Sequence, residues 1–165
     1  MVTCRIVRAA MVAGYQGLRA YPASLIFEDS LRQRVLASGD IVVHPIPHAS
    51  ASYPGSWRGV IDKLKAYDFA FLVPGHGSIQ TNCSYLDKLQ AAIIDIESQV
   101  EPLAAKGRSL NEVRKAMQFS RLQDEFAGDV ARDRSQMRDF FLKALVSNVF
   151  RTAKGDPIVQ GRDGR

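Results

Sequence analysis

The sequence contains few of the residues that mark several common classes of protein. It has two cysteines and three histidines among 165 residues, and no apolar run approaches the roughly 18 residues that a membrane-spanning helix needs. Cys4 and Cys83 are far apart and form no C-x-x-C pair, so neither a disulfide framework nor a thiolate zinc site is indicated. Two free thiols are typical of a reducing compartment, and no signal-peptide pattern opens the chain, so we expect a cytoplasmic protein.

The Lys and Arg residues are not arranged as in a nucleic-acid-binding protein. Lys and Arg number 22 against 17 Asp and Glu, which gives a net charge of +5. No four Lys or Arg residues occur in a row, and aromatic residues do not interleave with them as on a nucleic-acid platform. We therefore expect neither a nucleic-acid partner nor a membrane partner.

The composition is that of one globular domain, with 46% hydrophobic and 24% charged residues. We divide the chain into four parts. Residues 1–33 are an N-terminal segment without a clear pattern, 34–81 bear the strands, 82–155 are a helical part of the same domain, and 156–165 are a frayed tail. Cys4–Val12 is predicted as a strand or a helix and Ala23–Phe27 as a strand. The fold class that this pattern predicts is α/β (α+β), with a mixed sheet followed by helices.

A histidine between two glycines follows a short apolar run in the middle of the chain. Phe69–Val73 reads as a buried strand that ends at Pro74, because proline cannot extend a ladder. Gly75 and Gly77 allow backbone angles and close approaches that a β-carbon would forbid. His76 is thus expected at the end of a core strand, where α/β proteins tend to place functional groups.

An earlier apolar stretch, 34–43, reads as two strand pieces interrupted by Ser38-Gly39-Asp40. Glycine inside a strand pattern suggests a bulge or a close approach of another backbone. Asp40 has two interpretations that the local sequence leaves open. It closes a tight turn, or it is a carboxylate whose burial costs several kcal/mol unless a cation or donors meet it.

Residues 44–55 form a proline-bearing loop with two histidines. His44 and His48 are four residues apart, but Pro45 and Pro47 exclude a helix, so the pair is not a helical metal clamp. Both are read as surface residues, with pocket lining as the alternative. Ser56 is the predicted N-cap of a short helix through Leu64 that buries Trp57.

Helices dominate the rest of the chain. Apolar residues from Leu86 to Leu103 alternate spacings of three and four and predict a long helix that Gly107 stops. Ser109-Leu110-Asn111-Glu112 is a capping box that opens a shorter helix through about Met117. After Gly128, a further long helix ends near Gly155. Its predicted apolar face is Met137, Phe140, Phe141, Ala144, Leu145 and Val149.

Three motifs carry a resemblance to a known family. Ser38-Gly39-Asp40, then Ser52 to Trp57, then Pro74-Gly75-His76-Gly77 resemble in order and spacing the C-terminal portion of a metallo-β-lactamase-fold metallo-hydrolase. The resemblance covers residues 34 to 155, and the helix from Tyr85 resembles the helical end of one branch of that superfamily. It implies part of an αββα sandwich that holds zinc at one edge of its sheets.

The resemblance also implies roles for single residues. Asp40 is similar to the carboxylate that bridges two metal ions, and His76 to a terminal ligand of the second. Metal-bound hydroxide would then hydrolyse an ester, lactone, amide or thioester in a small-molecule substrate. Tyr53, with His44 or His48, would line the mouth of the cleft.

The chain departs from the family pattern before Asp40. The family opens its metal site with H-x-H-x-D-H, but the three histidines here are at positions 44, 48 and 76. A catalytic zinc normally takes three protein ligands, and only Asp40 and His76 are expected here, because the prolines restrict His44 and His48. We therefore expect zinc binding to be weak or absent and hydrolysis to be impaired. The alternative is a non-catalytic remnant that acts as an interaction or structural module.

The resemblance implies a truncated, rearranged or reading-frame-shifted member of the family, whose first 30 residues replace the lost half. Half of a sandwich leaves an apolar sheet face open. Residues 1–30, a second copy or a missing-half partner on another chain must cover that face. We predict a homodimer or poor solubility.

Overall fold

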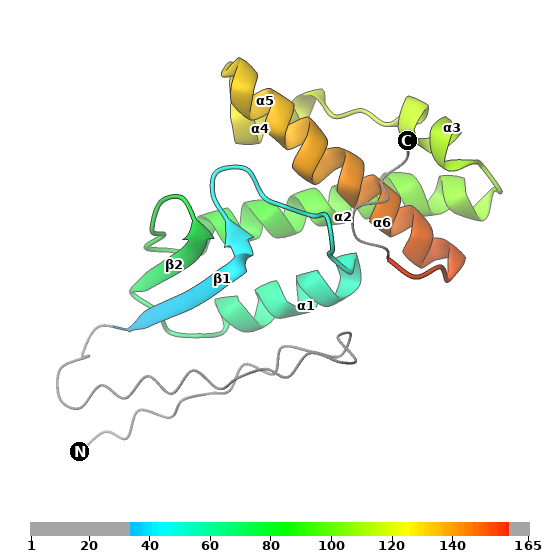
Figure 1. Cartoon of the computed structure of the whole chain (residues 1–165). Helices are drawn as coiled ribbons and strands as arrows, with labels where there is room; N and C mark the ends of the chain where they lie inside the picture. The colour runs from blue at the N-terminus through cyan, green and yellow to red at the C-terminus, as the bar shows by residue number, and fades with distance from the viewer. Residues whose placement is uncertain (1–33, 159–165) are drawn as a thin grey trace. The chain divides into compact units, whose positions relative to one another are not determined.

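The computed structural model describes residues 34–158. The divergent segment 1–33, the expected elements Cys4–Val12 and Ala23–Phe27, and the last residues of the tail lie outside this range. Within it, the fold is mixed α and β, with a small parallel sheet followed by helices (Figure 1). The α+β part of the prediction is confirmed at this level.

The sheet consists of β1 (Val35–Val43) and β2 (Phe71–His76), which run parallel. In the described part of the chain the predicted mixed sheet is reduced to this pair and one antiparallel bridge between Leu72 and Gln80. The two predicted strand pieces at 34–43 are one strand, with irregular pairing on either side of Gly39. The interruption read from Ser38-Gly39-Asp40 is therefore a bulge within a strand.

The prediction that Pro74 ends the second strand is wrong. β2 continues through Pro74 to His76, with Pro74 paired to Gly39 at the irregular part of the ladder. Proline lacks the amide that a ladder needs, so it is tolerated on edge strands and at bulges, and Pro74 meets both conditions.

Helix α1 (Pro54–Lys65) connects the two strands. It begins two residues before the predicted N-cap Ser56, and its N-cap is Tyr53, without a side-chain cap. The physical reason is Pro54, whose fixed φ and missing amide suit the first turn of a helix. Trp57 is buried on the inner face of α1, as predicted, and its indole N–H donates to the Ile41 carbonyl at 3.0 Å.

The longest helix, α2 (Ser84–Ala105), confirms the prediction from the three-and-four spacing. Gly107 has a φ of +77°, its amide bonds the Ala104 carbonyl, and the Arg108 amide bonds the Leu103 carbonyl. This is the Schellman arrangement that stops helices at glycine. The capping box of α3 (Leu110–Ala116) is present as predicted, with Ser109 and Glu112 bonded reciprocally.

The remaining helices differ from the prediction in two ways. Helix α4 (Ser120–Ala127) was missed, because its eight residues are too few for a clear period. The further long helix consists of α5 (Ala131–Gln136), a π-helical stretch η1 (Met137–Leu142) and α6 (Lys143–Lys154) in direct succession. The wider turn of η1 shifts the helix face, and Phe140 is consequently 45% exposed although it was predicted to be buried.

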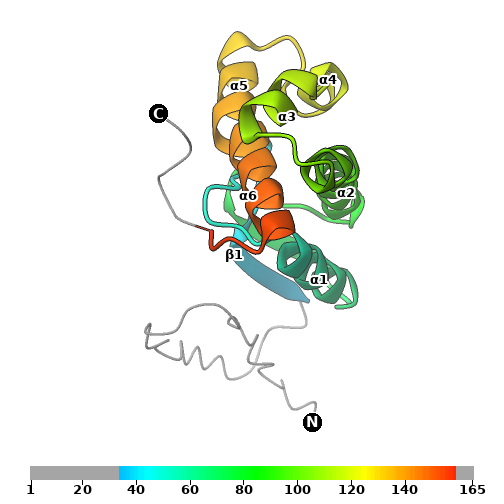
Figure 2. The same cartoon turned by 90° about the vertical axis from the view of Figure 1, so that its right-hand side faces the viewer.

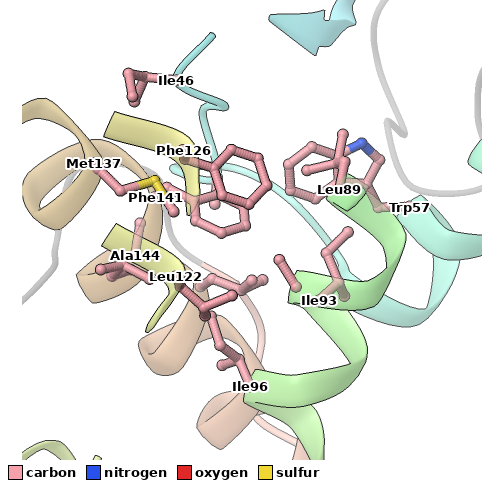
Figure 3. Close-up of a cluster of buried hydrophobic side chains, with 14 of the residues drawn as sticks. Ile46, Trp57, Leu89, Ile93, Ile96, Leu122, Phe126, Met137, Phe141 and Ala144 are labelled. Atoms are coloured by element: carbon pink, nitrogen blue, oxygen red, sulfur yellow. The ribbon is translucent and has the colours of Figure 1, made fainter. Parts of the chain in front are cut away.

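The core lies among the helices, on one side of the sheet. α2 and α6 pack side by side, and Figure 2 looks along α2 with α6 next to it. Figure 3 shows the aromatic centre of this core, where the ring of Phe141 lies 6.1 Å from Phe126 and 6.2 Å from Trp57. The strands add Val42 and Leu72, both fully buried.

No helix or strand between residues 34 and 158 packs over Val35 and Phe71 on the opposite face of the sheet. Val35 and Phe71 are partners in the ladder and are 47% and 38% exposed, whereas Leu72, one position along, is fully buried. The alternation of strand side chains thus separates a packed face from an apolar exposed face. None of the helices between residues 34 and 158 has both the length and the apolar character needed to span a bilayer.

Candidate metal-ligand pair at the strand ends

The two predicted metal ligands lie next to each other. Asp40 sits in the irregular part of β1 and His76 is the last residue of β2. Because the strands are parallel, their carboxyl ends meet at one edge of the sheet, which is where open α/β sheets bind ligands. The Oδ1 atom of Asp40 lies 3.5 Å from Nε2 of His76. Two residues far apart in the sequence therefore form one contact.

The pair is open to solvent. The side chain of Asp40 is 75% exposed and that of His76 is 70% exposed. An ion pair with this exposure is worth little to stability, since water screens both partners. The contact between Asp40 and His76 therefore contributes little to the stability of the fold.

Two glycines make the close approach possible. A β-carbon on Gly75 would lie 2.0 Å from Asp40 Oδ1 and 2.8 Å from the Asp40 amide nitrogen. Gly77 has a φ of +89°, and a β-carbon there would lie 1.9 Å from the His44 carbonyl oxygen. The reading of both glycines in Pro74-Gly75-His76-Gly77 as close-approach positions is confirmed.

His44 holds His76 through its backbone rather than through its side chain. The His44 amide donates to the His76 carbonyl at 3.0 Å. The imidazole is half-buried and packs edge-on against Tyr85, with ring centres 4.8 Å apart. Burial, and then the ammonium group of Lys88, lower the pKa of His44 below its ordinary 6.5, so the ring is neutral at pH 7.

One side-chain nitrogen of His44 is enclosed by the fold. Its Nδ1 atom is buried and has no hydrogen-bond partner in the described part of the chain. A buried Nδ1 is closed to a metal ion held by the exposed Asp40 and His76. That His44 is not a third ligand stays a prediction.

Tyr85 is a positioning residue that the sequence did not reveal. Its hydroxyl proton is shared between the Val43 carbonyl at 2.6 Å and the Pro45 carbonyl at 3.0 Å, the carbonyls of the two residues on either side of His44. Burial raises the pKa of the Tyr85 hydroxyl, so it stays a donor at neutral pH. Its only signal in the sequence was its place in the first turn of a predicted amphipathic helix, which also fits a plain core residue.

The loop from His44 to Tyr53 is tied to the last helices. The Ala49 amide donates to the Phe140 carbonyl at 2.9 Å, and Asn148 Nδ2 donates to the Ala49 carbonyl at 2.7 Å. Phe140 lies in η1. A π-helical turn has a different pattern of backbone hydrogen bonds from an α-helix, so different carbonyls accept bonds from amides of the helix. The loop that follows β1 is therefore held by residues almost 100 positions away.

The other two pocket candidates do not join the pair. The ring of His48 lies 4.9 Å from that of Phe140, and Tyr53 is 44% exposed at the start of α1. No hydrogen bond, ion pair or ring contact between residues 34 and 158 joins either of them to Asp40 or His76. Their pocket-lining role stays a prediction.

The donor set is incomplete for a catalytic zinc ion. Among the residues that the structure describes, no group of three or more His, Cys, Asp and Glu side chains comes together. Asp40 and His76 can supply one oxygen and one nitrogen, whereas catalytic zinc normally has three protein ligands. The residues present thus fit half of such a site.

Comparison of the chain with protein-family models, with curated proteins and with solved structures finds no match.

Proposed function

We propose that this chain corresponds to the C-terminal portion of a metallo-β-lactamase-fold hydrolase and that it has little or no hydrolytic activity on its own. The contact between Asp40 and His76 carries the proposal. The motifs that resemble the family supply both residues, with His76 at the end of β2 and Asp40 beside it in the irregular part of the parallel strand β1. Gly75, from the same motif, permits the approach.

Asp40 and His76 are the residues that would hold zinc. A zinc ion with enough protein ligands supplies hydroxide at neutral pH by lowering the pKa of its bound water. With two protein donors in the described part of the chain, we assign no hydrolytic step to it. The substrate class stays as broad as the resemblance implies: a small-molecule ester, lactone, amide or thioester.

The test combines metal analysis with hydrolysis assays. Purified full chain, dialysed against zinc, should hydrolyse ester, lactone, lactam and thioester substrates no faster than His76→Ala does. Turnover by the wild type that is lost in His76→Ala and in Asp40→Asn would contradict the proposed inactivity. Elemental analysis of the same samples measures zinc separately, so binding and turnover are distinguished.

A second candidate function, a non-catalytic interaction or structural module, is favoured by the open face of the sheet. Val35 and Phe71 are adjacent, apolar and well exposed. An apolar sheet face of this kind marks a surface that residues 1–30, a second copy or a missing-half partner covers.

Light scattering after size-exclusion chromatography tests this candidate. The wild type should self-associate or precipitate at raised concentration, and Phe71→Lys should reduce that association. Ile94→Lys is the matched control, because Ile94 is 45% exposed but lies on α2, away from the sheet. A wild type that is a soluble monomer with a cooperative melt would count against the open face as an interface.

A further inference from the structure

We propose that the helix formed by α5, η1 and α6 changes between two conformations, and that the loop after β1 holds it in one of them. In the structure η1 is π-helical, and its Phe140 carbonyl accepts the Ala49 amide of the loop. In the second conformation residues 131–154 form a continuous α-helix, Phe140 turns inward and the loop is released. The inference concerns another part of the molecule than the proposed function and does not depend on it.

One backbone hydrogen bond distinguishes the two conformations. The Lys143 amide donates to the Arg138 carbonyl, five residues earlier, whereas in an α-helix it would donate to Asp139. A π turn contains one residue more than an α turn. Conversion to a continuous α-helix would therefore rotate the residues before this turn against α6 by roughly 100°, the angle of one α-helical residue.

The sequence pattern supports the α-helical alternative. In a continuous α-helix Phe140 shares a face with the residues four, seven and eight positions later. These residues are Ala144, Ser147 and Asn148, which are 2%, 1% and 1% exposed. Phe140 would be buried on that face, but it is 45% exposed in the structure. The burial of its ring favours the α-helical conformation.

The α-helical conformation also keeps the centre of the core. Met137 and Phe141 are both fully buried and point into the same cluster (Figure 3). They are four residues apart, so they share one face at α-helical spacing as well. The change adds Phe140 to this face and removes neither neighbour from it.

The loop after β1 stabilises the π-helical conformation. Ala49 is fully buried, and its amide donates to the Phe140 carbonyl at 2.9 Å. The Ala49 carbonyl accepts from Asn148 Nδ2 at 2.7 Å. Ala49 thus lies on the helix face toward which Phe140 would turn, and its peptide and the inward Phe140 ring exclude each other.

The loop has one hydrogen-bonded attachment to the last helices. In the described part of the chain, the hydrogen bonds that join residues 48–52 to α5, η1 or α6 all involve Ala49. The two ends of the loop are fixed elsewhere, since Tyr85 bonds the Pro45 carbonyl and Tyr53 is the N-cap of α1. Release at Ala49 would therefore move 48–52 and leave β1 and α1 in place.

NMR couplings across hydrogen bonds test the inference, because they identify the carbonyl that accepts each amide. In the wild type the Lys143 amide should couple to the Arg138 carbonyl carbon. The Ala49 amide should couple to that of Phe140. A wild type in which Lys143 couples to Asp139 would overturn the inference, since the π-helical conformation would then not be the main one.

Asn148→Leu removes a donor that holds the loop. In this variant we expect the coupling of the Lys143 amide to move to Asp139 and the coupling of the Ala49 amide to be lost. Asn111→Leu is the matched control, because Asn111 is exposed on α3, and it should leave both couplings unchanged. Circular dichroism shows whether each variant is folded.

A variant of Phe140 gives an independent test. Relaxation dispersion of the wild type should show exchange on the microsecond-to-millisecond timescale at the Ala49 and Lys143 amides, with one shared rate. Phe140→Lys should abolish this exchange, because burial of a charged side chain disfavours the second conformation. Ile94→Lys is the matched control, since Ile94 is also 45% exposed but lies on α2, and its exchange should equal that of the wild type.

Three further results would overturn the inference. The first is a Lys143 amide that stays coupled to Arg138 in folded Asn148→Leu, because the loop then does not hold the helix. The second is a wild type without the shared exchange, and the third is exchange in Phe140→Lys equal to that of the wild type. The exchange measurements decide alone if Asn148→Leu does not fold. None of these measurements involves zinc or hydrolysis, so the proposed function is tested separately.

Discussion

Gly75 lies directly against Asp40: a β-carbon at position 75 would be 2.0 Å from Asp40 Oδ1 and 2.8 Å from the Asp40 amide nitrogen. β1 and β2 meet this closely at their bulge only because position 75 has no side chain. The absence of a side chain at position 75 is thus needed for the close packing of the strands beside Asp40.

Replacing Gly75 with alanine should destabilise the chain and displace Asp40. The Asp40 side chain can rotate away from the new methyl group, but its backbone cannot. We expect a loss of about 1–3 kcal/mol in the free energy of unfolding, as for other overpacked sites. Urea denaturation gives this value.

Gly59→Ala is the control for this substitution. Gly59 lies inside α1, and a β-carbon there would have nothing within 4 Å. Alanine is the better helix former, so this variant should gain about 0.5–1 kcal/mol. If Gly75→Ala is as stable as Gly59→Ala, the contact with Asp40 is not as close as described.

Removing the Tyr85 hydroxyl should loosen the turn that holds His76. In Tyr85→Phe the ring still packs against His44, but the carbonyls of Val43 and Pro45 lose their donor. An unsatisfied buried acceptor costs about 1–3 kcal/mol, and chemical denaturation should show a loss of that size. Tyr67→Phe, on an exposed tyrosine, should change stability by no more than about 0.5 kcal/mol. Equal stabilities of the two variants would show that the Tyr85 hydroxyl does not hold the turn.

Those parts of the fold that depend on local pattern were predictable. The spacing of Leu86, Leu89 and Ile93 specified α2, and Ser109 with Glu112 specified the start of α3. The adjacency of Asp40 and His76 is a different case. Neither residue indicates the other by local pattern, and only the resemblance of their motifs paired them.

The errors arose where distant contacts decide the structure. Pro74 was expected to end its strand, but a bulge in the neighbouring strand and an edge position let the strand continue to His76. The π-helical stretch around Phe140 has no period that a helical pattern detects, and its carbonyl meets Ala49 far earlier in the chain. Tyr85 looked like one more apolar residue of a helix, because its two acceptors lie some 40 positions away.

The burial of Glu97 beside Arg58 should give stability a dependence on pH. Glu97 is 9% exposed, and its carboxylate lies 2.9 Å from Arg58 Nε. Burial raises the pKa of Glu97 above its ordinary 4.5, with Arg58 opposing the shift and Glu101 adding to it. The folded chain therefore binds the proton more tightly than the unfolded chain.

The sign of the effect follows from this difference in proton binding. The contribution of Glu97 to the free energy of unfolding should fall as the pH rises from about 4.5 through the raised pKa of the folded state. Glu97→Gln should remove this fall, and Arg58→Met should extend it to higher pH. Urea denaturation at a series of pH values measures the slope. A slope that is unchanged in Glu97→Gln would show that another group is responsible.

Asn148 should control how firmly the loop after β1 is held. Its side chain is 1% exposed and donates to the Ala49 carbonyl, while the Ala49 amide donates to Phe140. Asn148→Leu keeps the approximate volume but removes the donor. Asn148→Asp is expected to be worse, because it buries a carboxylate against a carbonyl oxygen. We expect a loss of about 1 kcal/mol for the leucine variant, since Ser52 still donates to the Ala49 carbonyl, and a larger loss for the aspartate variant.

Hydrogen exchange at the Ala49 amide distinguishes a loosened loop from a general loss of stability. In Asn148→Leu this amide should exchange faster. The exchange rates of amides in the middle of α2 should change only as far as the global free energy of unfolding changes. Asn111→Leu is the matched control, because Asn111 is exposed on α3 and lies outside the loop contacts. Protection at Ala49 that falls no more than protection within α2 would mean that Asn148 stabilises the helical core alone, and that the Phe140 carbonyl is sufficient to hold the loop.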